Sequence, residues 1–397
     1  MKRLLSATAI GLAVASSAVA FETPQDGAAT AYLGAAAQGP GYKVAPAVPS
    51  DGFLRMFTID TQSSRFQVNG IELTKERLRE LQALDRLARM SESDVFTKSL
   101  GKAAMAPVRF GADLVTSPAT TINRTFSGIG NMFDRVQAGA ENQKASRDSM
   151  TGSLIGTDAA RRQLAVELGI DPYTDYQPLA QRLEAIAKAS ALGGLSVKAA
   201  LMAVPGPGGA VVSYSSTAGS IQDTLREKTS AQILQQVKAT LQRLKVPAAI
   251  SARLIDNRLY TPADLLIMAS ALGRLKAGNT HLFLARAVEA DTRDVAFFQR
   301  RRAELLAAKS EELGGIVEFV SVGTFPLNRT RDGTIVALFP LDEVAWTQVA
   351  ARAFQTVTGA LRLIGYQQSP VLATTAAVTP MANEELRKLG WRIFALK

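Results

Sequence analysis

Ser99 and Lys102 stand at the spacing that serine–lysine hydrolases use for a nucleophile and its base. The chain has one histidine and no cysteine, so a serine activated by a lysine is the one compact route to nucleophilic catalysis. On a helix, a Ser-x-x-Lys pair brings the amine to the hydroxyl within one turn, as in penicillin-recognising enzymes. Their companion motifs are missing, because no Ser-Asp-Asn occurs and Lys228-Thr229-Ser230 lacks the glycine of Lys-Thr-Gly. A Ser–Lys hydrolase and a plain polar helix face both remain open.

Two aspartates offer a second kind of chemistry. Glycoside hydrolysis needs two acids held across a sugar bond, and Asp171 and Asp175 flank Pro172-Tyr173-Thr174. Closeness in sequence does not place two acids across a substrate, so solvated charge is the competing interpretation. With Ser99 and Lys102, this pair defines the enzyme hypothesis: a hydrolase that acts on an envelope polymer.

The densest basic run of the chain is Arg300-Arg301-Arg302, which follows two phenylalanines. Long cationic side chains bind anionic surfaces while their stems cover apolar ones. The three arginines are therefore candidates for binding an anionic surface, with a solvated helix face as the alternative.

Metal and cofactor chemistry finds little support. Zinc sites use several His or Cys ligands, whereas this chain has only His281 and no cysteine. The glycine clusters at 128–130 and 206–209 lack the residues that complete a phosphate-binding loop. We therefore expect neither a metal nor a cofactor.

The first 20 residues have the pattern of a secretory signal peptide. Two positive residues precede an uncharged apolar run over 4–15, and Ala18 and Ala20 are the small residues that a signal peptidase reads. The run is shorter than the roughly 20 residues that span a bilayer. We expect export by the general pathway, cleavage before Phe21, and no transmembrane span in the mature chain.

Cysteine content and charge narrow the compartment and the partners. A chain of 397 residues with 0 cysteines fits the bacterial periplasm better than a disulfide-rich secreted protein. The formal net charge is +10, from 45 basic and 35 acidic residues; losing Lys2 and Arg3 with the signal leaves 43 against 35, or +8. An anionic envelope surface or another envelope protein is the expected partner. Nucleic acid is not expected outside the cytoplasm.

Apolar spacing divides the mature chain into four parts. Residues 21–50 are rich in Ala, Gly and Pro and predict a flexible leader. Residues 51–137 predict a small α+β region, with a strand pair turning at Asn69-Gly70. Residues 157–313 have helical spacing throughout and predict a helical domain. Residues 314–397 predict an α/β domain that ends in a parallel crossover.

Particular residues fix several of these elements. Thr261-Pro262 with Asp264 predicts a capped helix start, and 281–313 keeps one apolar face if it is a single long helix. The expected fold is mostly α with a smaller α/β part: a helical middle domain, a short N-terminal strand pair and a C-terminal mixed sheet with two helices.

The function that these observations favour is an exported periplasmic or envelope-associated helical binding or scaffold protein without evident catalysis. The hydrolase described above is one alternative, and a peripheral membrane-interacting protein is another.

Overall fold

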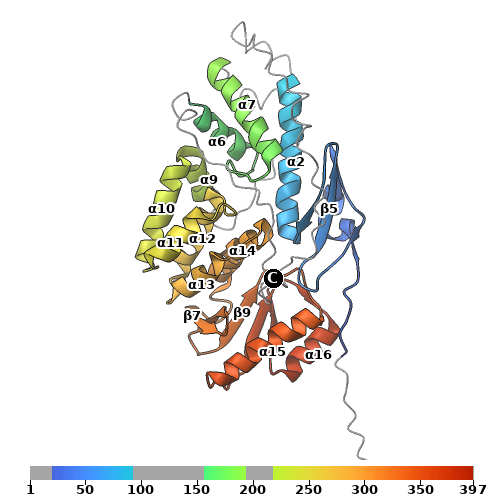
Figure 1. The fold of residues 1–397 in the computed structure, drawn as a ribbon, viewed down its shortest axis with the longest axis vertical. Coiled ribbons are helices and arrows are strands. Elements are labelled where there is room, and N and C mark those ends of the chain that lie inside the picture. Colours follow the sequence, from blue (N-terminus) through green and yellow to red (C-terminus); the bar gives the residue numbers. More distant parts are fainter. Residues whose placement is uncertain (1–19, 93–155, 194–217, 397) are drawn as a thin grey trace, which may run out of the picture.

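A computed structural model of the chain describes residues 20–92, 156–193 and 218–396. In Figure 1 helices α2, α6 and α7 lie at the top, the N-terminal strands on the right, and α9 to α13 on the left. The C-terminal sheet lies at the bottom with α15 and α16. The expected mostly helical fold with a smaller α/β part is confirmed.

The N-terminal strands form one antiparallel sheet and one small pair. The sheet has the order β2-β3-β5-β6, with β2 at Gln38–Gly39, β3 at Tyr42–Val44, β5 at Met56–Thr61 and β6 at Arg65–Asn69. The pair joins β1 (Gly27–Ala28) to β4 (Ala47–Val48), and α1 (Ala29–Leu33) and η1 (Gly34–Ala37) follow β1.

The expectation of a flexible leader over 21–50 was therefore wrong. Tyr42, Val44 and Val48 are buried in the same core as the α2 leucines. Tyr42 and Val44 alternate with exposed Lys43, which is the period of a strand that is buried on one face. The low-complexity composition concealed this alternation.

The strand pair turns earlier than the sequence predicted. Strand β5 pairs with β6 in a register that runs from Met56↔Asn69 to Asp60↔Arg65, so the connection lies at 62–64. Gly70, at φ 95°, ends the strand and leads into α2 (Ile71–Glu92). The Asn69-Gly70 signal thus marks a strand-to-helix junction, where the left-handed conformation again favours glycine.

All regular elements described between 157 and 313 are helices. They are α6 (Thr157–Glu167), α7 (Gln177–Gly193), α9 (Ala218–Glu227), α10 (Ser230–Arg243), α11 (Ala248–Asp256), α12 (Pro262–Leu275), α13 (Thr280–Ala287) and α14 (Arg293–Lys309). The predicted helix start at Thr261 is confirmed, with a capping box between Thr261 and Asp264. The proposed single helix over 281–313 is two helices, because Thr292 caps α14 by accepting a hydrogen bond from Val295 N.

The helices are divided between two hydrophobic cores. Helices α6 and α7 pack with α2 and the N-terminal sheet around residues such as Leu87, Leu164 and Ile186. Helices α10 to α14 share a second core with the C-terminal sheet. Phe297 of α14 belongs to the first core and Phe53 to the second. The helical middle therefore does not have a single core of its own.

The C-terminal sheet has the order β13-β11-β9-β8-β7. Its strands are β7 (Ile316–Val322), β8 (Phe325–Thr330), β9 (Ile335–Phe339), β11 (Val371–Thr374) and β13 (Arg392–Ala395). The first three are antiparallel, and β9, β11 and β13 are parallel. A separate parallel pair joins β10 (Glu343–Val344) to β12 (Ala377–Val378).

The crossover helices of this sheet are α15 (Gln348–Leu363) and α16 (Pro380–Lys388). They follow β9 and β11 in one direction along the sheet, so right-handed crossovers place both on one face. Helices α13 and α14 contact the sheet through rings such as Phe283 against Phe319 and Phe298 against Phe339. The predicted mixed sheet with two helices is confirmed.

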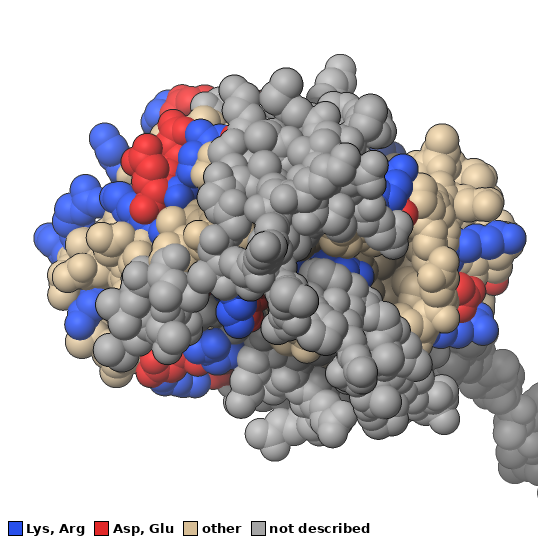
Figure 2. Space-filling model, turned by 90° about the horizontal axis from the view of Figure 1, so that it is seen from above, with Lys and Arg blue, Asp and Glu red and all other residues tan. Residues whose placement is uncertain are grey.

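Within the part of the chain that the structure describes, no helix is both long and apolar enough to span a membrane. The face in Figure 2 carries described acidic and basic side chains side by side, and Lys and Arg line its left edge.

Candidate functional site

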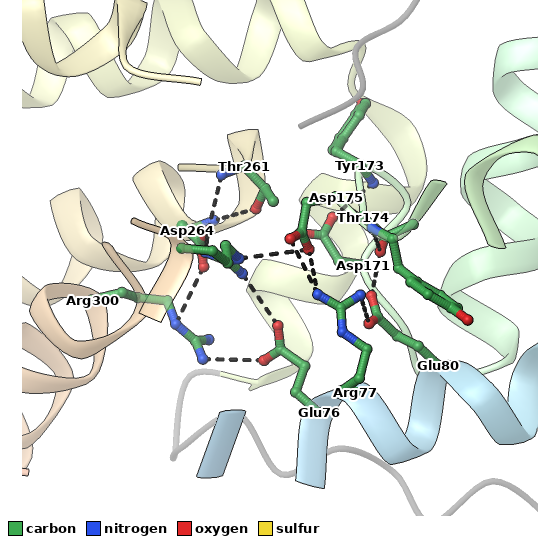
Figure 3. Close-up of polar contacts among 12 residues, drawn as sticks. Glu76, Arg77, Glu80, Asp171, Tyr173, Thr174, Asp175, Thr261, Asp264 and Arg300 are labelled. Carbon is green, nitrogen blue, oxygen red and sulfur yellow. Dashed lines mark hydrogen bonds and ion pairs between the residues drawn. The ribbon is translucent and has the colours of Figure 1, made fainter. Parts of the chain in front are cut away.

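A network of buried charges joins four parts of the chain (Figure 3). Its side chains come from α2, from the segment 170–176, from the start of α12 and from α14. The acidic members are Glu76, Glu80, Asp171, Asp175 and Asp264, and the basic members are Arg77, Arg293 and Arg300. Because these elements belong to different cores, the network lies where the two halves of the fold meet.

Arg77 holds one end of the network. Its Nη1 donates to Glu80 Oε2 at 2.6 Å, and its Nη2 donates to both oxygens of Asp175 at 3.0 and 3.1 Å. The guanidinium also lies over the ring of Tyr176, 4.9 Å from the centroid. Arg77 and Glu80 are three residues apart on α2, so one helical turn brings them together. Thr174 Oγ1 donates to the other oxygen of Glu80.

Arg293 and Arg300 extend the network along α14. Seven residues separate them, which is two helical turns, so both lie on one face. Arg293 Nη1 donates to Asp264 Oδ2 at 2.6 Å, and its Nε lies 3.6 Å from Asp175 Oδ1. Arg300 pairs with Glu76 at 3.2 Å and with Asp264 at 3.3 Å. Asp175 thus links Arg77 to Arg293, and Asp264 links Arg293 to Arg300.

Local structure orients the acidic members. Asp264 is the third residue after Thr261, and its Oδ2 accepts from Thr261 N at 2.9 Å, so the α12 capping box fixes the carboxylate beside the positive end of the helix. Asp171 accepts from the backbone of Tyr173 at 2.8 Å, which holds the tight turn after α6. Asp264 and Asp171 therefore each accept a hydrogen bond from a backbone N–H and also interact with other charged groups of the network.

Burial and charge separate the pKa values of the acids. Burial, with the neighbouring Asp175 and Glu76, raises the pKa of Glu80 to about 8, although Arg77 opposes the rise. Burial and Asp264 raise the pKa of Asp171 to about 7. Burial also opposes ionisation of Asp175, but Arg77 and Arg293 outweigh it and hold the pKa of Asp175 below its usual value.

A charge balance explains this division. Five carboxyl groups face three guanidinium groups, an excess of two acids (5 − 3 = 2). The two acids with raised pKa values, Glu80 at about 8 and Asp171 at about 7, are the ones that keep their protons as the pH rises toward neutral. An uncompensated buried charge is costly, so protonation of these two balances the site.

The structure brings together two candidate sets that the sequence treated separately. Asp171 and Asp175, the carboxylate candidates, belong to the same network as Arg300, an anionic-surface candidate. The two aspartate side chains are buried, at 7% and 4% exposed. Their hydrogen bonds and ion pairs are made within the protein.

The basic run 300–302 does not form the exposed face that the sequence suggested. Arg300 and Arg302 are 5% and 1% exposed, and half-buried Arg301 pairs with Glu304. Arg302 points away from the network: its Nε donates to Leu338 O at 2.9 Å and its Nη2 to Pro326 O at 2.5 Å. Successive helical residues are rotated by about 100° around the helix axis, and α14 is covered on both sides. Arg300 therefore lies in the buried charge network, whereas Arg302 lies against the C-terminal sheet.

The other candidates have different outcomes. Ser99, Lys102 and Ala18 lie outside the described residues, so the serine–lysine pair and the cleavage motif stay predictions; Ala20 is exposed and in no regular element. In the described ranges, no group of three His, Asp or Glu side chains is placed to hold a metal ion.

Sequence reasoning missed Arg77, Glu80 and Arg293. On α2, Arg77 and Glu80 look like any solvated i,i+3 pair, and Arg293 has two aspartates, Asp291 and Asp294, as close neighbours in the sequence. The one available signal was the capping box at Thr261, which announces a fixed carboxylate at Asp264. No local sequence pattern predicts that Arg293 and Arg300 pair with this carboxylate.

Comparison with known proteins gives no further guidance. No family model matches the chain, and no curated protein or solved structure is significantly similar to it.

Proposed function

We propose that the protein is an exported, envelope-associated helical binding or scaffold protein. The observation that carries this proposal is the buried network, whose charged groups bond to one another across α2, α12 and α14. In our proposal the network serves to favour one arrangement of these elements over others, a role that buried ionic groups have in some proteins. A fixed arrangement suits a support or docking protein.

The amino-terminal pattern supports the location. Two positive charges, an apolar run and small residues at Ala18 and Ala20 match the pattern of a signal peptide that directs export. The cysteine-free composition suits a periplasm, and a net positive charge after signal removal favours association with anionic surfaces.

Cell fractionation tests this proposal. The full chain, expressed in a Gram-negative bacterium, is separated into cytoplasm, periplasm and envelope with and without a high-salt wash. We expect the mature chain outside the cytoplasm, with an envelope-bound part that salt releases. The matched control replaces Ala18 and Ala20 by lysine, which removes the cleavage motif and should leave the signal attached. A mature chain found in the cytoplasm would contradict the proposal.

One observation favours a second function, a paired-carboxylate hydrolase. Acid–base catalysis uses neighbouring carboxyls with separated pKa values, and Glu80 (raised) and Asp175 (lowered) form such a pair across Arg77. Hydrolysis of cell-wall polymer that is lost in Glu80→Gln would support this function. Labelling by a fluorescent penicillin tests the serine route, and equal labelling of wild type and Ser99→Ala would exclude it.

A further inference from the structure

Exposed cations gather on helices α10 to α12. Between residues 228 and 280, all of which the structure describes, a single acidic residue is exposed, Asp256. The exposed basic residues in the same span are Lys238, Arg243, Lys245, Arg253, Arg274 and Lys276. In Figure 2 Lys and Arg line the left edge of the molecule, on the side where Figure 1 places α10 and α11.

Four of these cations meet at one end of a helix pair. Helix α10 packs on α12 with their last turns adjacent: a Cβ at Gly273 would lie 3.6 Å from Thr240 Cγ2. The residues that follow these contacts are Arg243, Lys245, Arg274 and Lys276, which we call the cationic end. Among the described residues, none of the four forms an ion pair, and Arg243 donates to the neutral Thr240 hydroxyl at 3.0 Å.

The backbone at the cationic end is unusual for lysine. Lys245 and Lys276 adopt left-handed conformations at φ 57° and 52°, and Asn279 is the one other non-glycine residue with positive φ in the described ranges. Glycine is the usual residue at such helix ends, because a Cβ is disfavoured there. The helix dipole attracts cations to these ends, but it does not account for lysine in two positions that suit glycine.

The surroundings of the cationic end fit a bilayer surface. Pro247, Ala248 and Ala249 are exposed and follow Lys245 after one buried residue, Val246. Val317, 42% exposed, lies next to Gly278, whose N–H donates to Val317 O at 2.7 Å. Small apolar groups among cations can enter the headgroup region while the charges meet lipid phosphates.

The same surface does not suit single-stranded nucleic acid. Binding of single strands depends on aromatic side chains that stack on bases. The one aromatic residue between 228 and 280 is Tyr260, which is buried and donates its hydroxyl to Ala287 O.

We infer that the cationic end is a docking surface for a bilayer that contains anionic phospholipid. The inference rests on the proposed envelope location for its biological setting, but the binding itself is a property of the purified chain. Failure to bind vesicles would remove this inference and leave the fractionation result unaffected, so the two proposals fail separately.

Co-sedimentation with vesicles tests the inference. The purified mature chain is mixed with vesicles of zwitterionic phosphatidylcholine, alone or with phosphatidylglycerol, from about 0.05 to about 0.5 M salt. We expect binding only to vesicles with the anionic lipid, and its loss at high salt. The combined variant Arg243→Gln, Lys245→Gly, Arg274→Gln, Lys276→Gly should bind at least roughly tenfold more weakly. Glycine at 245 and 276 suits the left-handed backbone, so the fold is retained, which circular dichroism verifies.

The control separates a local surface from net charge. It replaces four exposed cations elsewhere, Lys43, Arg65, Arg387 and Arg392, by glutamine, and should bind like the wild type. Equal losses in both variants would overturn the inference, since net charge alone would then drive binding. Absence of binding to anionic vesicles would also overturn it, as would binding to duplex DNA without binding to vesicles.

Discussion

Arg77 and Asp175 are joined by two hydrogen bonds from one guanidinium nitrogen, at 3.0 and 3.1 Å, across 98 residues of sequence. Both side chains are buried. Arg77 belongs to α2, and Asp175 ends the tight turn that leads from α6 into α7. Asp175 also contacts Arg293 of α14. Through Asp175, the Arg77 contact therefore helps to fix the position of α2 relative to α14.

Breaking this contact should destabilise the fold strongly. In Arg77→Ala, Asp175 and Glu80 lose the hydrogen bonds that the Arg77 guanidinium donates to them, and removal of one partner of a buried pair costs about 3–5 kcal/mol. The free energy of unfolding in urea measures the loss. The control is Arg89→Ala on the same helix, which removes an exposed pair with Asp85 and should cost no more than about 1 kcal/mol. Similar losses of unfolding free energy in both variants would show that the buried pair contributes no more to stability than the exposed pair.

Stability should fall as pH rises from about 5 to about 8. The pKa of Glu80 is raised from 4.5 to about 8 in the folded protein, so in this window the unfolded chain releases a proton that the folded chain retains. Rising pH therefore stabilises the unfolded state relative to the folded state and lowers the free energy of unfolding. Asp171 and Asp342, whose pKa values burial raises to about 7, act in the same direction. Asp175, with a lowered pKa, acts oppositely but only under more acidic conditions.

Glu80→Gln isolates the contribution of this residue. Glutamine resembles the protonated acid and does not ionise, so the variant should lose less stability than the wild type between about pH 5 and about pH 8. Urea unfolding at several pH values measures both slopes. A wild type whose stability rises over this range, or a variant with an unchanged slope, would contradict the assigned proton on Glu80.

Arg302 should contribute as a hydrogen-bond donor between helix and sheet. Extending the β8–β9 register places Pro326 opposite Leu338, and proline has no N–H to donate. Arg302 donates to both carbonyl oxygens instead. Burial and Arg286 lower its pKa to about 9.

Arg302→Met should therefore lower the free energy of unfolding by about 2–4 kcal/mol, because two buried carbonyls lose their donors. Arg301→Met, at the half-buried neighbour, should change it by less than about 1 kcal/mol. Thermal or urea unfolding of the two variants gives the comparison. An Arg302→Met protein as stable as the wild type would mean that packing alone holds α14 on the sheet.

The double variant Lys245→Gly, Lys276→Gly should melt at or above the wild-type temperature. Relief of two left-handed side chains, at about 1–2 kcal/mol each, offsets the lost dipole interaction and the added freedom of glycine in the unfolded chain. The matched variant Lys245→Ala, Lys276→Ala keeps the Cβ and should melt lower than the glycine variant. The reverse order in a thermal melt would show that the lysine side chains themselves stabilise these helix ends.

Local signals predicted elements well where one residue pattern determines the backbone. Thr261 and Asp264 correctly predicted the start of α12. The hairpin turn predicted at Asn69-Gly70 was wrong, because a left-handed glycine suits both a hairpin turn and the residue before a helix. The assignment of α6 and α7 to one core and α10–α14 to another depends on long-range packing, which periodicity does not encode.

The network was beyond sequence reasoning for a physical reason. Arg77, Arg293 and Arg300 lie on helices whose charged residues repeat as they do on any solvated face. Burial of that face depends on the approach of α2 to α14, which only the whole fold determines. Asp171 and Asp175 were singled out as a pair, but the arginines that bind Asp175, Arg77 and Arg293, come from distant parts of the chain, Arg77 98 residues away.

The amino terminus of the chain isolated from cells tests the proposed export most directly. Mass spectrometry of protein from the envelope and periplasmic fractions should find a chain that begins at Phe21, without the 20 residues before it. An intact chain that begins at Met1 and is found only in the cytoplasm would contradict the proposed function.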